Sequence, residues 1–361
     1  MHINEFLKVM IDTGASDIYL KVGSPPALRI SDKLQMIDAQ YGIEIDKLTP
    51  SDTYDLAYSI MNEQQREEFQ KTNEYDFAYI VPGLGRFRVN VYRQRGSIGM
   101  VLRVIAFKIR SVGELELPSI VLKLAEETRG LILISGPAGA GKTTTMAAMV
   151  HHINDVRFCH VVTIEDPLEY LHRDNKSVIS QREVGSDTAS FAEALRHVVR
   201  QNPDVILIGE LRDPETINAA LSAAETGRLV IGTLHAPDSI QTIRRLIDIF
   251  PANEQQRVRS QLAFILKAIF YQILLPSTTE GKRVLAYEVI IGTPAICNLI
   301  REAKIEQIST LIQAGAQYGM QNMNVSLMQL LKEGKISSEV ALINSRDPKE
   351  LQQEMLRAGI R

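Results

Sequence analysis

Between residues 119 and 292, short apolar runs alternate with segments of helical periodicity. Four runs, at 131–134, 161–164, 205–208 and 229–233, have the length and composition of strands buried on both faces. Strands that alternate with helices are typical of a largely parallel sheet. The pattern therefore predicts an α/β domain over this part of the chain.

Polar residues mark the ends of two helices in this domain. Ser190, followed three residues later by Glu193, forms a capping box and predicts a helix start. Asp213 and Pro214 predict a second start, because Asp is a preferred N-cap and proline suits the first turn. Gly227 predicts the end of that helix.

The first hundred or so residues follow a different order and predict a separate α+β domain. A helical stripe near the N-terminus precedes a strand at 17–22, and a helical region at 51–71 follows. Three antiparallel strands come next, joined by turns at Pro82-Gly83 and Arg95-Gly96. These strands are expected at 75–81, 86–92 and 98–105.

Helical patterns return after Thr293-Pro294, near residues 295–315, 325–333 and 337–342. The methionines there, Met320, Met323 and Met328 among them, are expected to fill a core. We therefore expect an N-terminal domain at 1–106, a linker at 107–118, the α/β domain at 119–292 and a C-terminal helical region at 293–361.

Composition narrows the class of protein. The 361 residues include 40 basic and 43 acidic side chains, a formal net charge of −3, and show no stripe of aromatic and basic residues, so we expect no nucleic-acid partner. Two distant cysteines make no disulfide framework or zinc module. With no signal peptide and no apolar run of about 18 residues, an intracellular, soluble protein is expected.

The most specific motif is a complete phosphate-binding loop at residues 136–143, which matches G-x-x-x-x-G-K-[ST]. It lies between a predicted strand and a predicted helix, so backbone N–H groups and the helix dipole point at a polyphosphate. Lys142 is expected to neutralise the phosphates of ATP, and the Thr143 hydroxyl to hold Mg²⁺. The expected nucleotide-binding set is Gly136, Pro137, Ala138, Gly139, Ala140, Gly141, Lys142, Thr143 and Thr144.

Three further strand ends carry polar side chains: the acidic box at 163–170, the segment 209–213, and the segment ending at His235. Ligands of parallel sheets bind at the carboxyl ends of the strands, so these ends are expected to meet. Glu210 is the expected general base and Glu165 a second carboxylate that holds the attacking water. Gly209 occupies the usual Walker B aspartate position, so Mg²⁺ is expected on Thr143 and waters.

Other side chains keep two interpretations. In the functional interpretation, His235 senses the γ-phosphate or bridges neighbouring subunits. In the structural interpretation, it is a hydrogen-bonded histidine without a role in catalysis. The arginines at 86, 88, 93, 95 and 103 form either a solvated strand face or a source of arginine fingers. Arg196 and Arg200 are alternative fingers.

On these residues the chain resembles the secretion-type (type II/type IV pilus) ATPase superfamily, specifically its pilus-retraction branch. The resemblance covers essentially the whole chain and also includes residues 86–96. It implies a PAS-like N-terminal domain, a RecA-like ATPase core and a ring of six subunits. ATP would sit between the two domains, and Arg88 and Arg103 stand where the family's arginines reach the phosphates.

The C-terminal part distinguishes retraction from extension. The extension ATPases of this family usually carry a longer N-terminus and a four-cysteine zinc insert, and this chain has neither. Retraction members carry the block Ala-Ile-Arg-Asn-Leu-Ile-Arg-Glu, which residues 295–302 match except at Cys297. Arg244 and Tyr19 are two further departures from the family pattern.

The resemblance implies a hexameric, Mg²⁺-dependent ATPase motor that disassembles type IV pili by rocking of its two domains, at the cytoplasmic face of the inner membrane. Its implied partners are the pilus platform protein of that membrane and a paralogous retraction ATPase. The alternatives are an accessory retraction ATPase, a non-hydrolysing paralogue that modulates a partner motor, and a nucleic-acid motor.

Overall fold

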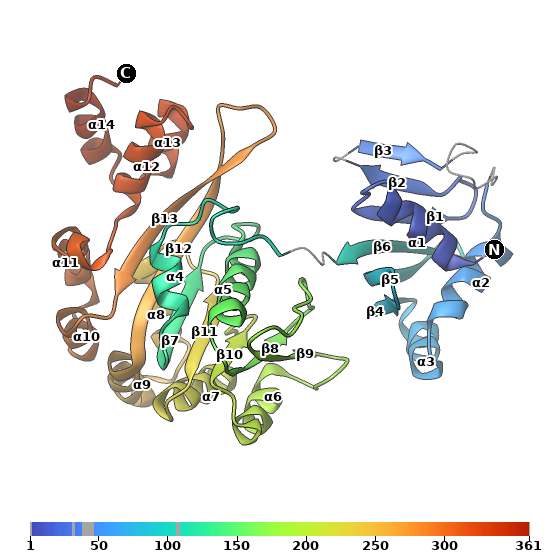
Figure 1. Cartoon of the computed structure of the whole chain (residues 1–361), viewed down its shortest axis with the longest axis horizontal. Coiled ribbons are helices and arrows are strands. Elements are labelled where there is room, and N and C mark those ends of the chain that lie inside the picture. Colours follow the sequence, from blue (N-terminus) through green and yellow to red (C-terminus); the bar gives the residue numbers. More distant parts are fainter. Residues whose placement is uncertain (1, 31–32, 38–46, 106–108, 361) are drawn as a thin grey trace. The chain divides into compact units, whose positions relative to one another are not determined.

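The computed structural model describes residues 2–30, 33–37, 47–105 and 109–360, and Figure 1 shows its elements. The chain forms two compact units. The first contains Met1–Lys108 and Glu169–Leu171, and the second contains Ile109–Leu168 and His172–Arg361. Residues 106–108, where the linker was expected to begin, lie outside the described residues.

The first unit is built on an antiparallel sheet of six described strands in the order β3-β2-β1-β6-β5-β4. The three predicted strands at 75–105 are confirmed as β4, β5 and β6. The elements are α1 (Ile3–Asp12), β1 (Asp17–Lys21), β2 (Ala27–Ile30), β3 (Lys33–Met36), α2 (Pro50–Ile60), α3 (Glu63–Thr72), β4 (Glu74–Val81), β5 (Gly85–Gln94) and β6 (Ser97–Ile105).

Two features of this unit differ from the sequence-based expectation. The helical region at 51–71 is two helices, because Met61 is extended and the Asn62 side chain caps α3 by accepting from the Gln65 N–H. Strands β2 and β3 were not predicted. All four residues of β3 are exposed, so no alternation of apolar and polar residues marks it.

The second unit contains a sheet of seven described strands in the order β13-β12-β7-β11-β10-β8-β9, parallel except for the pair β12–β13. The four predicted strands lie side by side at its centre. The elements are α4 (Ile120–Ala125), β7 (Gly130–Ser135), α5 (Lys142–Val156), β8 (His160–Glu165), β9 (Val178–Glu183), α6 (Phe191–Val198), η2 (Val199–Gln201), β10 (Val205–Ile208), α7 (Pro214–Glu225), β11 (Leu229–Leu234), α8 (Ser239–Asp248), α9 (Ala252–Ile265), β12 (Leu266–Pro276) and β13 (Arg283–Ile291).

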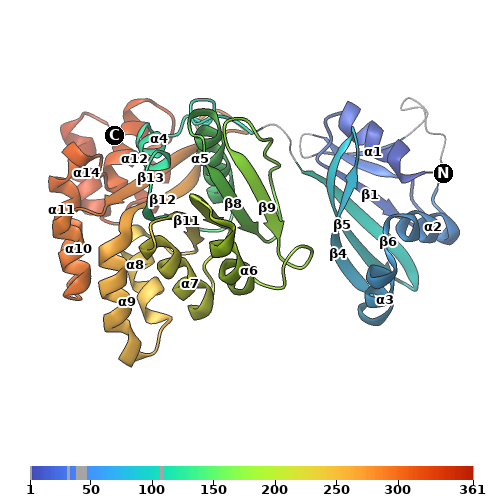
Figure 2. The same ribbon diagram turned by 60° about the horizontal axis from the view of Figure 1, so that its bottom comes forward.

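Helices cover both faces of this sheet, as Figure 2 shows. Successive side chains of a strand point to opposite faces, so β7 supplies Leu131 and Leu133 to one core and Ile132 and Ile134 to the other. Helices α6 to α9 pack on the first core, and α4 and α5 pack on the second. Burial on both faces explains why the central strands are continuous apolar runs.

The predicted helix ends are largely confirmed. Asp213 caps α7 with Pro214 in its first turn, and Gly227 follows its last residues with a positive φ of 93°. Ser190 caps α6 by accepting from the Glu193 N–H at 3.1 Å. The reciprocal half of the expected capping box does not form, because the Glu193 carboxylate contacts Arg196 and His197 instead.

The C-terminal region is helical, but the piece expected at 295–315 is broken where Ala303 takes a left-handed φ of 59°. Its first helices pack on the core of α6–α9, and the last three pack with β12 and β13. Met320, Met323 and Met328 are buried, as expected. The elements are α10 (Pro294–Arg301), η3 (Ile305–Gln307), α11 (Ile308–Ala314), η4 (Ala316–Tyr318), α12 (Met323–Lys332), α13 (Ser338–Asn344) and α14 (Pro348–Arg357).

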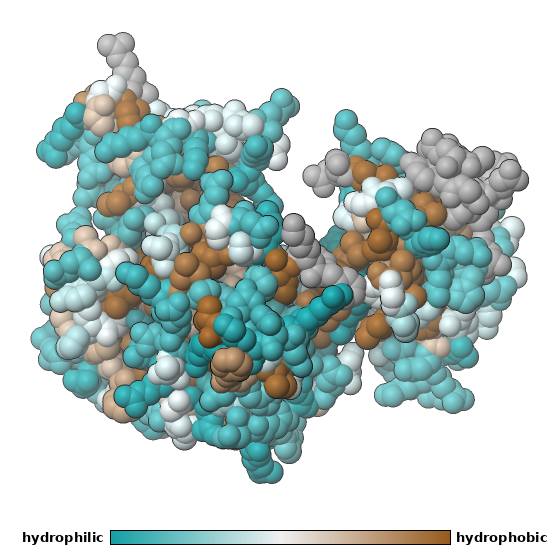
Figure 3. Space-filling view, viewed as in Figure 1, coloured by the Kyte–Doolittle hydropathy of each residue, from teal (hydrophilic) through white to brown (hydrophobic). Residues whose placement is uncertain are grey.

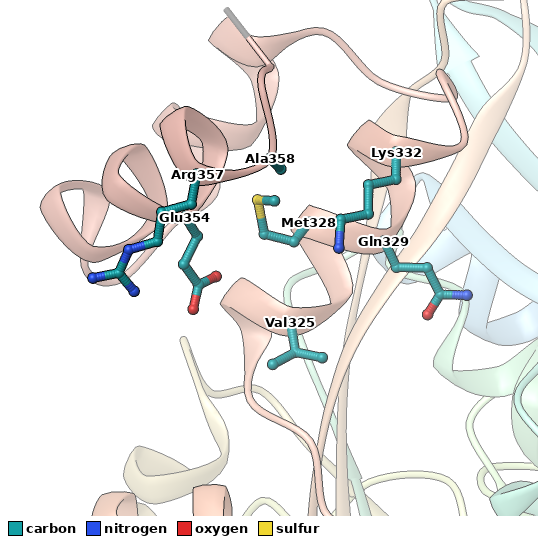
Figure 4. Close-up of a pocket in the computed structure, with 7 residues that line it drawn as sticks. All are labelled: Val325, Met328, Gln329, Lys332, Glu354, Arg357 and Ala358. Carbon is teal, nitrogen blue, oxygen red and sulfur yellow. The ribbon is translucent and has the colours of Figure 1, made fainter.

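Hydrophobic residues are scattered over a largely hydrophilic surface in the view of Figure 3. Within the described ranges, no helix combines the length and apolar character needed to cross a membrane. A pocket opens between α12 and α14, where Figure 4 shows Val325 and Met328 beside Lys332, Glu354 and Arg357. Its charged lining consists of two cationic side chains and one anionic side chain.

Candidate nucleotide site

The carboxyl ends of four parallel strands meet at one edge of the second unit's sheet. Strand β7 ends at Ser135, which pairs with Leu234 at the end of β11. Ile208 at the end of β10 pairs with Ile164, one residue before the end of β8. The phosphate loop, Glu165, Glu210 and His235 follow from these ends, so the expected convergence is confirmed.

The phosphate loop runs from β7 to the first turn of α5, which begins at Lys142. Gly136, Gly139 and Gly141 all have positive φ. A Cβ on Gly136 would lie 2.2 Å from the Gln272 carbonyl oxygen, so only glycine fits there. The turn leaves the first N–H groups of α5 without intrahelical acceptors, which is the arrangement that binds phosphate.

Lys142 connects the phosphate loop to two other strand ends. Its buried ammonium donates to the carbonyl oxygens of Gly136 and Pro137, at 3.0 and 2.8 Å. The same Nζ lies 3.3 Å from His235 Nδ1, and His235 Nε2 lies 3.5 Å from Glu210 Oε1. Three residues selected from the sequence therefore form one line of contacts, from Lys142 through His235 to Glu210.

Arg212 holds the other oxygen of the Glu210 carboxylate. Its Nε donates to Glu210 Oε2 at 2.7 Å, and its Nη1 lies 3.5 Å from Asp166 Oδ2. The hydrogen bond to Glu210 raises the pKa of the Arg212 guanidinium. With a partner on each oxygen, the Glu210 carboxylate has a defined orientation. Sequence reasoning gave Arg212 no role, although it follows Glu210 by only two residues.

The close approach of β8 and β10 explains the glycine at the Walker B position. A Cβ on Gly209 would lie 3.3 Å from both the Glu165 Cα and the Ile164 carbonyl oxygen, tighter than ordinary contacts. An aspartate at this position would therefore push on the backbone that carries Glu165. The Glu165 side chain is buried and accepts a hydrogen bond from Thr163 Oγ1 at 2.7 Å.

Gln272 on β12 supports the phosphate loop and was missed by sequence reasoning. The side chain is 1% exposed. Its Nε2 donates to the Ala140 carbonyl at 2.6 Å, and its Oε1 accepts from Thr145 Oγ1 at 2.8 Å. It therefore joins the loop to the first turn of α5. A single amide inside an apolar run is a usable signal, but β12 was not itself predicted.

Replacing Gln272 with methionine, which has a similar volume, should weaken nucleotide binding. The change leaves the Thr145 hydroxyl and the Ala140 carbonyl buried without these partners, which should cost about 1–3 kcal/mol of unfolding free energy. Urea denaturation and ADP titration measure the two effects. Gln353→Met, at an exposed position of α14, is the matched control. Equal ADP affinity in the Gln272 variant and the control would show that the loop needs no such support.

The residues present fit a magnesium ion that arrives with the nucleotide. Within residues 2–30, 33–37, 47–105 and 109–360, no three or more His, Cys, Asp or Glu side chains form a group that could hold a metal. Mg²⁺ typically keeps several waters and takes one or two protein ligands beside the phosphates. The Thr143 hydroxyl, at the start of α5 beside the loop, is suited to that role.

Arg88 and Arg103 lie directly opposite each other on β5 and β6 of the first unit. Arg88 makes an exposed ion pair with Asp76 at 3.8 Å, whereas Arg103 donates to the buried carboxylate of Asp17 at 2.7 Å. The register thus places two guanidinium groups together on one face of that sheet. Their role at a nucleotide stays a prediction. The alternative Arg196 makes ion pairs with Glu193 and Glu215.

The three departures from the family pattern have local explanations. Arg244 on α8 makes an ion pair with Glu306 of η3. Tyr19 accepts a hydrogen bond from Arg29 at 2.9 Å. Cys297 is half-buried on α10 against the core of α6–α9, and burial raises the pKa of its thiol.

Comparison with known proteins identifies the class. Residues 97–340 match the family model of the type II/IV secretion system protein. The chain is 43% identical over 348 residues to the type IV pilus retraction ATPase PilT of Pseudomonas aeruginosa, covering 96% of this chain and 99% of the relative. It is 39% identical to the type IV pilus ATPase PilU of the same organism, and the alignment covers 97% of this chain and 90% of the relative.

A solved structure agrees with these relatives. The crystal structure of the pilus retraction motor PilT with bound ADP has a TM-score of 0.89 and 48% identity, covering 98% of this chain and 99% of that one. This chain belongs to the type II/IV secretion system protein family. The resemblance drawn from the motifs and the predicted α/β fold class are both confirmed.

Proposed function

We propose that this protein is an ATPase motor that powers retraction of type IV pili. The observation that carries the proposal is the line of contacts from Lys142 through His235 to Glu210 at a complete phosphate loop. It occurs in a chain that resembles PilT over almost its whole length. Lys142, His235 and Glu210 are thus in contact, and the full-length similarity supports their use in a retraction motor.

In the proposed mechanism, ATP binds with its phosphates over residues 136–141 and the first N–H groups of α5. Lys142 exchanges its two loop carbonyls for phosphate oxygens. Mg²⁺, held through Thr143, supplies positive charge at the phosphates when bound. Glu210 accepts a proton from the attacking water, and Glu165 helps to orient that water. Arg88 and Arg103 stabilise the charge that develops on the transferred phosphoryl group.

His235 reports on the position of Lys142 in this scheme. Its Nδ1 faces the Lys142 ammonium and its Nε2 faces the Glu210 carboxylate. When Lys142 turns to the phosphates, His235 exchanges that neighbour for the γ-phosphate. These contacts favour the sensing interpretation over a purely structural one, because both neighbours of His235 are proposed to act on ATP.

The assembly and its partners form part of the same proposal. The motor is a homohexamer that uses Mg²⁺-ATP and acts on the pilus platform protein from the cytoplasmic face of the inner membrane. A paralogous retraction ATPase, related to this chain as PilU is, is a further partner. The similarity to both PilT and PilU supports this arrangement.

One observation favours an accessory role instead. In the block that resembles the retraction branch, the half-buried thiol of Cys297 stands in place of an arginine. This removes a positive charge from α10. An accessory motor would contribute to retraction only beside a second ATPase of the family.

Deletion of the gene tests the proposed function. A strain that lacks this protein should carry more surface pili than the wild type and should lose twitching motility, because pili would extend and not retract. Restoring the wild-type gene is the control. Bald cells would assign the protein to extension, and unchanged pili and motility would reject the main retraction role in favour of the accessory one.

A further inference from the structure

A second group of charged side chains, built around one buried carboxylate, lies outside the phosphate loop. Glu288 on β13 is 1% exposed. Its carboxylate accepts from the Ser239 hydroxyl and from the Ser239 N–H, the latter at 3.3 Å. Arg346 Nη2 lies 3.0 Å from the same carboxylate and 3.5 Å from Asp238 Oδ1. Arg346 belongs to the segment between α13 and α14, so this group joins the C-terminal helices to the sheet.

The surroundings of the Arg346 guanidinium fix its position beside Glu288. Its guanidinium lies over the Tyr271 ring, 5.7 Å from the centroid. Partial burial lowers the pKa of Arg346 to about 10, and full burial raises the pKa of the Glu288 carboxyl. The Glu288 side chain is 2% exposed and the Arg346 side chain 34% exposed, so it is the carboxylate that depends on its partner. An ion pair on a buried carboxylate adds little net stability compared with apolar packing, so this pair is better suited to fixing geometry.

Both neighbours of this group lead directly to the nucleotide site. Asp238 is the N-cap of α8 and lies three residues after His235, with only Ala236 and Pro237 between them. The loop 235–238 is thus held at one end by β11 and at the other by Glu288 and Arg346. Tyr271, under the Arg346 guanidinium, precedes Gln272, which supports the phosphate loop.

We propose that Arg346 is a positioning residue for ATP hydrolysis, which fixes the loop 235–238 and so holds His235 between Lys142 and Glu210. The inference rests on the proposed role of His235. It implies that a shift of the segment between α13 and α14 moves Arg346 and its partner Asp238. Because Asp238 lies three residues after His235, the backbone passes this shift on to His235. Nucleotide affinity, which depends on the phosphate loop, should change little.

The test is a variant that removes both charges, Arg346→Met with Glu288→Gln, so that the buried Glu288 carboxylate is not left without its cation. Glutamine can still accept from Ser239, which preserves the start of α8. The expected result is a turnover number about tenfold lower, with KM for ATP and the unfolding temperature close to wild type. Arg357→Met, an exposed arginine of α14, is the matched control. Wild-type turnover in the double variant would overturn the inference.

Asp238→Asn repeats the test if the double variant does not fold. Asparagine is an equally good N-cap, so α8 keeps its start while Arg346 loses its anionic partner on the loop. Turnover should fall, with KM for ATP unchanged. Wild-type turnover in this variant would also overturn the inference.

His235→Ala separates the inference from the function on which it rests. If His235→Ala leaves turnover unchanged, the proposed role of His235 fails. If it lowers turnover while the Arg346/Glu288 variant does not, only the inference about Arg346 fails. If Arg346 acts through His235, adding the Arg346/Glu288 changes to His235→Ala should lower turnover no further. A full additional decrease would show that Arg346 acts by another route.

Discussion

Replacing Glu210 with glutamine should lower the turnover number for ATP by about 10²- to 10⁴-fold, the range typical for loss of a general base. Glutamine has nearly the same shape and can still accept a hydrogen bond from Arg212 Nε, which now lies 2.7 Å from the carboxylate. It cannot accept a proton from water. The structure therefore predicts a protein that folds and binds ADP normally but hydrolyses ATP very slowly.

Phosphate release at saturating ATP measures this effect, and ADP titration checks that binding survives. Glu225→Gln is the matched control, because Glu225 is an exposed residue of α7 whose contact in the structure is Gln261. Turnover near wild type in the Glu210 variant would remove Glu210 from the role of base. The buried carboxylate of Glu165 would then be the next candidate.

Replacing Arg88 with alanine should lower turnover by about 10³-fold or more if this arginine acts as a finger, because a finger stabilises charge only in the transition state. Arg103→Lys should have an effect of the same kind, since lysine lacks the planar fork of the guanidinium. Binding of ADP should change little in either variant. Both residues belong to the first unit and are paired across β5 and β6.

The two arginines differ in what their removal does to stability. The ion pair of Arg88 with Asp76 is exposed, and such pairs contribute about 0–1 kcal/mol. Arg103 contacts the buried Asp17, which also contacts Arg29 at 3.8 Å and Ser16 at 2.8 Å, so removal of Arg103 would weaken the pairing of a buried carboxylate. Arg88→Ala is therefore the cleaner kinetic test, and lysine is the safer replacement at position 103.

Arg93→Ala controls for loss of positive charge on the same strand. Arg93 follows Arg88 by five residues on β5 and so lies on the opposite face of the sheet. Its guanidinium lies over the ring of Phe69. Wild-type turnover in both Arg88→Ala and Arg103→Lys would leave the arginines as a solvated strand face.

Local sequence patterns predicted the elements that depend only on neighbouring residues. The central strands are apolar runs because both of their faces are buried, and Asp213 caps α7 because its carboxylate reaches the Thr216 N–H at 2.8 Å. The phosphate loop was recognisable because its glycines, Lys142 and Thr143 lie within eight residues. Strands β9, β12 and β13 were missed: β9 is mostly half-buried and follows no clear alternation, and β12, which is continuous with α9, pairs with β13.

The sequence by itself determined the class of protein, the phosphate loop and the residues that follow the central strands. Only the tertiary structure decided which of these residues touch, because contacts across a sheet depend on register between distant segments. Gln272 reaches Thr145 across 127 residues, and Lys142 reaches His235 across 93. The tight space around Gly209 and the pairing of Arg346 with Glu288 likewise arise from close approach of strands and helices that no local pattern encodes.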